Sequence, residues 1–543
     1  MVFARRSTTL LAAIIASCAM VLSLTACTSD NKTVVDGQTT VTSNSAGGVA
    51  VFTPSDGITL NQQMPLNKWA KLVPDLTKAL VDAGFKKGDI NHTTSDSLDK
   101  QSRAIQDFVV DHLSNNTTDD SGIAIAPDNM TLLVAPVVEA DASTRQYGDY
   151  ISQNLSTNDA TDGEATSDGE SSEDDSSKDD SSNTESDSTA SDEQAQAVDR
   201  LVSSLKLAKE SGMHVVLLGN SIEGYKPDAF VKFSDAQTIG KLQAEKMVSK
   251  LKLDKASKDN PKYIEVLLPY TAVDEKGNAN DSTFVQEAFR GIWQVLGSYY
   301  QKGVVESPSG TLDGKSTEND WQAVAYDAAK EGSTAKVLDK RLAKTDGQST
   351  LTRIDGIITM NDYIASEVVK ELDDLGYTGS AADINPQITI SGIVGNITGK
   401  KDLSRDAVPD PIKSPENDNA NDSSSSDDDA DEDTSASDKD RDSQWPLVTG
   451  YGAYVSNIPS IVNGKQWMTG MEDRQTIATD IAQACAKLNK DEALNSMPSI
   501  RNSEVGGVKK IPTISEPLLA VSASNLKSAL IDPGYISLAD AGL

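Results

Sequence analysis

The sequence contains few cysteines and histidines, which limits the chemistry that it can support. Three cysteines and three histidines occur among 543 residues. None of them form a cluster with the spacing of a zinc site. A Gly-x-Ser-x-Gly nucleophile motif and a paired His and Cys nucleophile are also missing from the sequence. We therefore expect no enzyme, no bound metal and no cofactor.

Basic residues are scarce relative to acidic ones. The chain has 49 Lys and Arg against 82 Asp and Glu, and its net charge is −33. Two tracts rich in Ser, Asp and Glu carry most of that charge, with −13 in residues 158–193 and −10 in residues 410–442. The remainder is only mildly acidic. No segment has the positive charge that nucleic-acid binding needs, so we expect no nucleic-acid partner.

The two acidic tracts are nearly empty of large apolar residues. Such segments cannot bury enough surface to offset the entropy of ordering the chain, so we predict disordered loop insertions at 155–194 and 404–444. Long insertions of this kind cost little, because loop-closure entropy grows only logarithmically with length. Binding of divalent cations or of the cell wall is the functional alternative.

Long hydrophobic runs are missing as well. The one extended apolar run, at residues 10–24, spans 15 residues and follows Arg5 and Arg6. A membrane-spanning helix needs ~20 residues, so the layout predicts an export signal over residues 1–26. The run ends in Leu24-Thr25-Ala26-Cys27, which resembles the lipobox of bacterial lipoproteins. That resemblance implies cleavage before Cys27 and a diacylglyceryl group on its thiol, whereas a plain secretory signal is the alternative.

The predicted processing decides where the mature chain lies and how its cysteines are used. A lipid on Cys27 would anchor the protein on the outer face of the cytoplasmic membrane, with residues 27–47 as a flexible tether. Cys18 would leave with the signal. Cys485 would then be the one free cysteine, so no internal disulfide is expected.

From residue 48 onward, short apolar strands alternate with amphipathic helices. Examples are a strand at 49–52, a helix at 69–83, a strand at 214–218 and a helix at 236–251. Repeated alternation of this kind is typical of parallel sheets covered by helices. The length allows two such α/β lobes.

Several segments in this order resemble one family. They are Asn67-Lys68-Trp69, the stretch 240–244, Met360-Asn361-Asp362, the stretch 461–473 and the tail 524–535. Together they resemble the sugar-binding lipoproteins of ABC importers, in the type I periplasmic-binding-protein class, and most closely the xylose, galactose and multiple-monosaccharide binders.

The resemblance implies an α/β fold of two doubly wound parallel-sheet lobes, joined by a three-segment hinge, with a ligand cleft between them. Lobe 1 would comprise 48–222 and 473–512, and lobe 2 would comprise 223–472 and 513–543. The implied partners are a small carbohydrate-like ligand and an ABC permease in the membrane, and we expect a monomer.

The resemblance also implies a set of ligand-binding residues. Core packing is the ordinary alternative for Trp69 and Trp321, and helix capping is the alternative for Asn280 and Asp281. The candidates are Lys68, Trp69, Asn220, Asp235, Asn280, Asp281, Trp321, Asn361, Asp362 and Tyr451.

Some of the strongest sugar-binding groups of the family are replaced in this chain. Lys68 stands for an Arg and lacks its bidentate fork. Gly219 and Asn220 stand for an Asp-Arg pair, and Tyr451 and Gly452 stand for a Gln-Asp pair. The ligand is therefore expected to differ from an ordinary monosaccharide, with Tyr451 as a stacking surface. The alternative function is a sensor or structural lipoprotein that keeps the fold without sugar uptake.

Overall fold

The computed structural model describes residues 32–35, 38–41, 46–55, 65–115, 125–138, 144–157, 185–273, 280–328, 330–343, 351–381 and 444–543. Residues 1–44 and 45–543 form separate compact units. The predicted signal peptide and Cys27 lie outside the described residues.

The N-terminal unit contains a short hairpin. Strands β1 (Lys32–Val35) and β2 (Gln38–Val41) pair antiparallel. Both strands are rich in β-branched Thr and Val, and Asp36-Gly37 between them is a sequence typical of hairpin turns. The segment 27–47, which we predicted to be a flexible tether, thus includes paired strands.

A seven-stranded sheet forms the centre of the first lobe of the larger unit. Its order is β17-β18-β9-β7-β5-β3-β4, and every pair is parallel except β17 with β18. The strands are β3 (Gly48–Pro54), β4 (Ile90–Ser95), β5 (Met130–Val134), β7 (His214–Leu218), β9 (Ala229–Lys232), β17 (Ile500–Val505) and β18 (Val508–Ser515).

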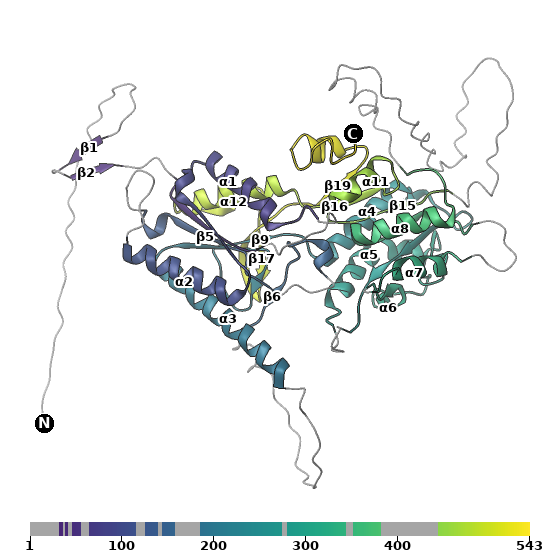
Figure 1. Cartoon of the computed structure of the whole chain (residues 1–543), viewed down its shortest axis with the longest axis horizontal. Coiled ribbons are helices and arrows are strands. Elements are labelled where there is room, and N and C mark those ends of the chain that lie inside the picture. Colours follow the sequence, from purple (N-terminus) through teal and green to yellow (C-terminus); the bar gives the residue numbers. More distant parts are fainter. Residues whose placement is uncertain are drawn as a thin grey trace, which may run out of the picture. The chain divides into compact units, whose positions relative to one another are not determined.

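Helices cover both faces of this sheet, as Figure 1 shows. Alternate residues of β3 point to opposite faces, so Val51 packs with α1 (Trp69–Asp82) and α12 (Arg474–Leu488), whereas Phe52 packs with α2 (Leu98–Asn115) and α3 (Glu185–Glu210). Two short strands, β6 (Asn154–Leu155) and β8 (Ser221–Ile222), pair parallel beside the lobe.

The second lobe is built on a four-stranded parallel sheet with the order β12-β10-β14-β15. Ile358 of β14 packs on the side of α4 and α5, and Ile357 packs on the side of α7 and α8. The elements are β10 (Lys262–Val266), β12 (Val305–Glu306), β14 (Gly356–Ile358), β15 (Leu447–Val448), α4 (Ala236–Lys250), α5 (Thr283–Gln301), α6 (Trp321–Val324), α7 (Ser333–Arg341) and α8 (Asp362–Leu375). Strands β11 (Leu268–Pro269) and β13 (Ala325–Tyr326) pair parallel beside them.

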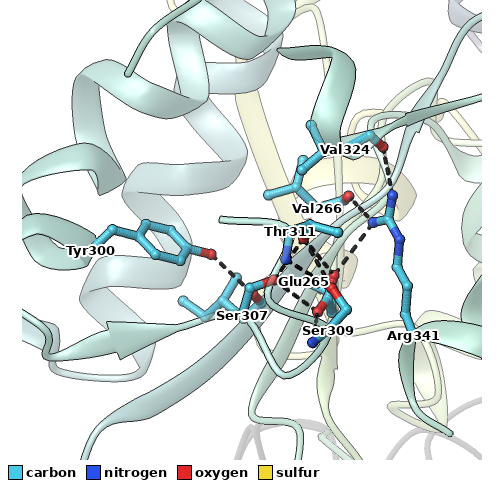
Figure 2. A network of polar contacts seen from close by, with 9 residues as sticks. Glu265, Val266, Tyr300, Ser307, Ser309, Thr311, Val324 and Arg341 are labelled. Atoms are coloured by element: carbon cyan, nitrogen blue, oxygen red, sulfur yellow. Dashed lines mark hydrogen bonds and ion pairs between the residues drawn. The ribbon is translucent and has the colours of Figure 1, made fainter. Parts of the chain in front are cut away.

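A buried ion pair holds one edge of this second sheet together (Figure 2). The carboxylate of Glu265 on β10 accepts from Ser307 Oγ at 2.8 Å and from Ser309 N at 2.9 Å, and lies 3.4 Å from Arg341 Nη1. Arg341 also donates to the Val324 carbonyl at 2.9 Å. Burial lowers the pKa of Arg341, and Glu265 opposes that shift.

Three segments carry the chain between the lobes. Residues 233–235 lead from β9 to α4, residues 472–473 lead from β16 (Met468–Met471) to α12, and residues 516–518 lead from β18 to β19 (Leu519–Ser522). Strands β16 and β19 pair antiparallel, and α11 (Ile458–Val462) packs near them. The predicted architecture of two doubly wound α/β lobes with a three-segment hinge is confirmed by these sheets and crossings.

The lobe boundaries lie later in the chain than we predicted. Residues 230–232 and 513–515 pair with each other in the first sheet, although the sequence reasoning assigned them to lobe 2. The ends of β9 and β18 set the lobe boundaries, because the chain leaves the first sheet only where the hydrogen bonds between its strands end.

The predicted acidic insertions are only partly covered by the structure. The first, 155–194, begins in β6 and ends inside α3, which starts at Glu185. The end of this insertion, residues 185–194, continues the packed part of α3 toward its N-terminus. The rest of it, and all of the second insertion except Gln444, lies outside the described residues. In the part of the chain that the structure covers, no helix is long and apolar enough to cross a membrane.

Candidate functional site

The carboxyl ends of the parallel strands of both lobes lead toward the crossings. In doubly wound sheets, ligands bind outside these ends. The segments that follow the strands are Gly219 and Asn220 after β7 and Thr359 to Asn361 after β14, with Thr449 to Tyr451 after β15. This junction between the lobes is therefore the candidate site.

A buried polar network ties two of the crossings together. The Tyr451 hydroxyl donates to Glu472 Oε1 at 2.6 Å, accepts from Asn67 Nδ2 at 3.0 Å and lies 2.5 Å from Ser234 Oγ. Ser234 N also donates to Glu472 Oε1, at 3.2 Å. Glu472 is fully buried, so burial raises its pKa, and its Oε2 has no hydrogen-bond partner.

At the third crossing, burial and a hydrogen bond with Asp480 raise the pKa of Glu516 to about 7.

Two segments of lobe 1 reach lobe 2 at the junction: Leu66 and Asn67, which bond to Gly452 and Tyr451, and residues 144–151, which we call the strap. Tyr147 of the strap is 2% exposed and belongs to a core cluster of lobe 2. Its ring lies 4.7 Å from that of Phe284 and 6.2 Å from that of Tyr451, between centroids. Burial raises the pKa of Tyr147, and a hydrogen bond with Asn361 opposes that shift. The strap thus occupies the ends of the lobe 2 strands.

Lys68 and Trp69, at the start of α1, both contact the strap. Lys68 Nζ lies 2.6 Å from Asp149 Oδ1, and Trp69 N donates to Asp149 Oδ2 at 3.1 Å. The Trp69 ring is 3% exposed and packs edge-on against Tyr150 and Phe233. In this conformation, Trp69 belongs to the core of lobe 1.

The candidates Asn220, Asn280 and Asp281 have hydrogen-bond partners within their own lobes, whereas Asp235, in the first crossing, has one partner in each lobe. Asn220 accepts from Gln153 N and donates to the Pro136 carbonyl, both at 2.9 Å. Asp235 caps α4 through Thr238 N at 2.7 Å. Although burial opposes it, hydrogen bonds from Lys232 and Thr238 lower the pKa of Asp235. Asn280 donates to the Thr271 carbonyl at 2.8 Å, and Asp281 accepts from Thr283 N at 2.9 Å in the turn that opens α5.

Asn361 and Asp362 open α8 and are fully buried. Asn361 Oδ1 accepts from Ile364 N at 2.9 Å as the helix cap, and its Nδ2 donates to Gln146 Oε1 of the strap at 3.1 Å. Asp362 accepts from Gln466 Nε2 at 2.7 Å and from Thr469 Oγ1 at 2.9 Å. Burial raises the pKa of Asp362 to about 6, although these donors oppose the shift.

The last two candidates differ in accessibility. Tyr451 is fully buried, and its ring lies beside Tyr147, so it offers no open stacking surface in this conformation. Trp321 is half-buried at the start of α6 and meets Tyr270 edge-on at 5.4 Å. Trp321 lines an open depression of about 320 Å³, which also contains Thr271, Gln322, Tyr326 and Asp327.

The structure therefore brings Asn361 and Tyr451 together around the strap and leaves Trp321 at an open surface. Ligand contact stays a prediction for each candidate residue. The sequence reasoning missed Gln146 and Tyr147. The run Tyr147-Gly148-Asp149-Tyr150, two aromatics around a glycine between a strand and an acidic tract, is the signal that could have pointed to them.

No protein-family model and no curated protein matches the sequence. Solved structures similar to the chain include a solute-binding protein from Clostridium phytofermentans with bound β-D-glucose, at 17% identity and a TM-score of 0.44, covering 91% of this chain and 99% of that one. A sugar ABC transporter protein from Actinomyces odontolyticus has 10% identity and a TM-score of 0.44, with 89% and 97% covered. A periplasmic ribose ABC transporter protein from Conexibacter woesei has 12% identity and a TM-score of 0.42, with 90% and 96% covered. The ligand of this chain must be inferred from its own residues.

Proposed function

We propose that the protein is an extracytoplasmic solute-binding protein of an ABC transporter, anchored by a lipid on Cys27. It captures a small carbohydrate-like ligand between its two lobes and delivers it to a membrane permease. The observation that carries this proposal is the junction itself, where the carboxyl ends of two parallel sheets lead to three chain crossings. Such an arrangement allows hinge closure around a ligand.

The depression around Trp321 supports a ligand with one apolar face and several hydroxyl groups. The Trp321 and Tyr270 rings offer apolar surface, and Asp327, Gln322 and Thr271 offer polar groups. Its volume of about 320 Å³ is at the lower end of the range for small-molecule sites.

A ligand screen tests this function. The detergent-solubilised mature lipoprotein is heated with monosaccharides, disaccharides, polyols and nucleosides, and its melting temperature is recorded. A ligand at a hundredfold excess over its dissociation constant stabilises the folded state by ~2.7 kcal/mol. We expect a hit that Trp321→Ala abolishes and that Tyr299→Ala, which removes a ring on α5 outside the depression, retains. A hit that Trp321→Ala leaves intact would contradict the assigned ligand surface.

Membrane anchoring is tested separately by cell fractionation. Cys27→Ser removes the thiol that would carry the lipid, so we expect the protein to move from the membrane fraction to the medium or the soluble fraction. Cys485→Ser is the matched control, because Cys485 is buried and distant in sequence from the signal. Unchanged membrane attachment of Cys27→Ser would contradict lipidation.

One observation favours the sensor or structural alternative. Asn220, Asp362 and Tyr451 are buried, and each has its hydrogen-bond partners within the chain. A site built for a polar ligand leaves such groups for the ligand to pair with. A screen in which no solute stabilises the protein would favour this second function.

A further inference from the structure

The strap is fixed to lobe 1 at its C-terminal half. Asp149 N donates to the Asn67 carbonyl at 2.8 Å, and the Asp149 carboxylate binds Lys68 and the first amide of α1. The Tyr150 ring stacks on Phe233 at 4.7 Å, and its hydroxyl donates to the Lys68 carbonyl at 2.6 Å. These contacts fix Asp149 and Tyr150 of the strap to lobe 1, although Ile151 belongs to the same lobe 2 core cluster as Tyr147.

The N-terminal half of the strap is held by lobe 2. Gln146 accepts from Asn361 Nδ2 at 3.1 Å through its side chain and from the Tyr454 hydroxyl at 2.6 Å through its carbonyl. Tyr147 packs among the apolar residues of lobe 2, against Phe284. Two adjacent residues of lobe 1 therefore supply lobe 2 with hydrogen bonds and one aromatic ring.

The contacts of the strap with lobe 2 are of the same chemical kinds as those that a small ligand with hydroxyl groups would make. An amide and a carbonyl pair with Asn361 and Tyr454, and a ring covers Tyr451, which we predicted to be a stacking surface. We propose that the strap is an internal ligand, which keeps the two lobes closed without solute and must be displaced from lobe 2 before a solute reaches Asn361 and Tyr451. The displacement step rests on the proposed function, whereas closure by the strap does not.

Closure by an internal ligand has a measurable consequence. The apparent affinity for a solute equals the intrinsic affinity of the open lobes multiplied by the fraction of molecules in which the strap is released. A change that releases the strap therefore opens the lobes and, where a solute binds, tightens its binding by the same factor.

A substitution at Gly148 should release the strap. It has a φ of +97°, and an added Cβ would lie 2.6 Å from the Asn67 backbone oxygen and 2.7 Å from its Cβ. Gly148→Ala must therefore shift the strap against lobe 1. Gly376→Ala is the matched control, because Gly376 has a φ of +92° and a Cβ there meets nothing within 4 Å. Both variants place a Cβ on backbone with a positive φ, and only in the first does that Cβ meet a neighbouring segment.

The experiment measures the distance between lobes by spin labelling in the absence of any solute. Labels are placed at Val81→Cys on α1 and Lys340→Cys on α7, both exposed, while Cys485 is buried. In the mature lipoprotein we expect one short, narrow distance distribution, which Gly376→Ala preserves. In Gly148→Ala the ratio of closed to open molecules should fall by roughly 5- to 30-fold, the factor expected for the loss of one or two hydrogen bonds.

Tyr147→Phe provides a second variant that keeps the ring packed and removes only the hydroxyl. It should shift the distribution in the same direction and by less than Gly148→Ala. A wild-type chain that is open without solute, or a Gly148→Ala distribution equal to that of Gly376→Ala, would overturn the proposal. If the strap variants open the lobes but no solute stabilises any of them, closure by the strap is supported and the proposed solute-binding function is contradicted.

Discussion

Replacing Tyr451 with Phe removes one hydroxyl from the hinge network and leaves the packed ring in place. That hydroxyl donates to Glu472 Oε1 at 2.6 Å and accepts from Asn67 Nδ2 at 3.0 Å, in a fully buried setting. A buried polar group left without its partner costs about 1–3 kcal/mol, and Asn67 Nδ2 becomes such a group after the change, whereas Glu472 Oε1 keeps the hydrogen bond from Ser234 N. We therefore expect the free energy of unfolding to fall by about 1–3 kcal/mol.

Tyr299→Phe is the matched control. The Tyr299 hydroxyl also lies 2.6 Å from a carboxylate, Asp254 Oδ1, but this pair is at the surface. Water replaces the lost bond there, so the expected cost is within about 0.5 kcal/mol. The assay is urea unfolding, followed by tryptophan fluorescence and by far-UV circular dichroism, whose transitions must coincide for the free energies to be comparable.

The pH dependence of the same variant provides a further check. Burial raises the pKa of Glu472, so its contribution to stability is full below the unfolded pKa and is lost as pH rises through the folded pKa. Tyr451→Phe removes a donor that lowers this pKa, so the variant should lose more stability at pH 7 than at pH 4, relative to wild type. A Tyr451→Phe cost no larger than that of Tyr299→Phe would refute the reasoning about this network.

Two further predictions concern buried charges of lobe 2. Burial raises the pKa of Asp362 from 3.8 to about 6, so this group alone should lower wild-type stability by about 2 kcal/mol between pH 4 and pH 6. Asp362→Asn should remove this part of the slope in urea midpoints measured across that range, and an unchanged slope would contradict the assignment. Arg341→Met leaves the Glu265 carboxylate buried without its cation, so we expect a loss of about 3–5 kcal/mol in urea unfolding. Arg290→Met, at a half-exposed pair, should cost about 1 kcal/mol or less, and equal losses in both variants would refute the role of burial.

Local sequence patterns were sufficient to predict several of the helices and strands of the core. Helix α1 was expected at 69–83 and ends at Asp82, because its apolar residues recur at helical spacing and Gly84 follows. The strand at 214–218 was expected within its observed bounds, because a short run of buried apolar residues is local information. Asp281 also bonds to a helix amide, which is the ordinary alternative that its sequence context allowed.

The candidate site was less predictable, because its chemistry depends on segments that are distant in sequence. Nothing around Asn361 in the sequence indicates that Gln146 will pair with its amide, and nothing around Tyr451 indicates that Tyr147 will cover its ring. The sequence by itself determined the alternation of elements and the two-lobe α/β class, since hydrophobic periodicity acts over a few residues. Only the tertiary structure decided that the strap of lobe 1 meets the strand ends of lobe 2, since that contact depends on how the two lobes pack.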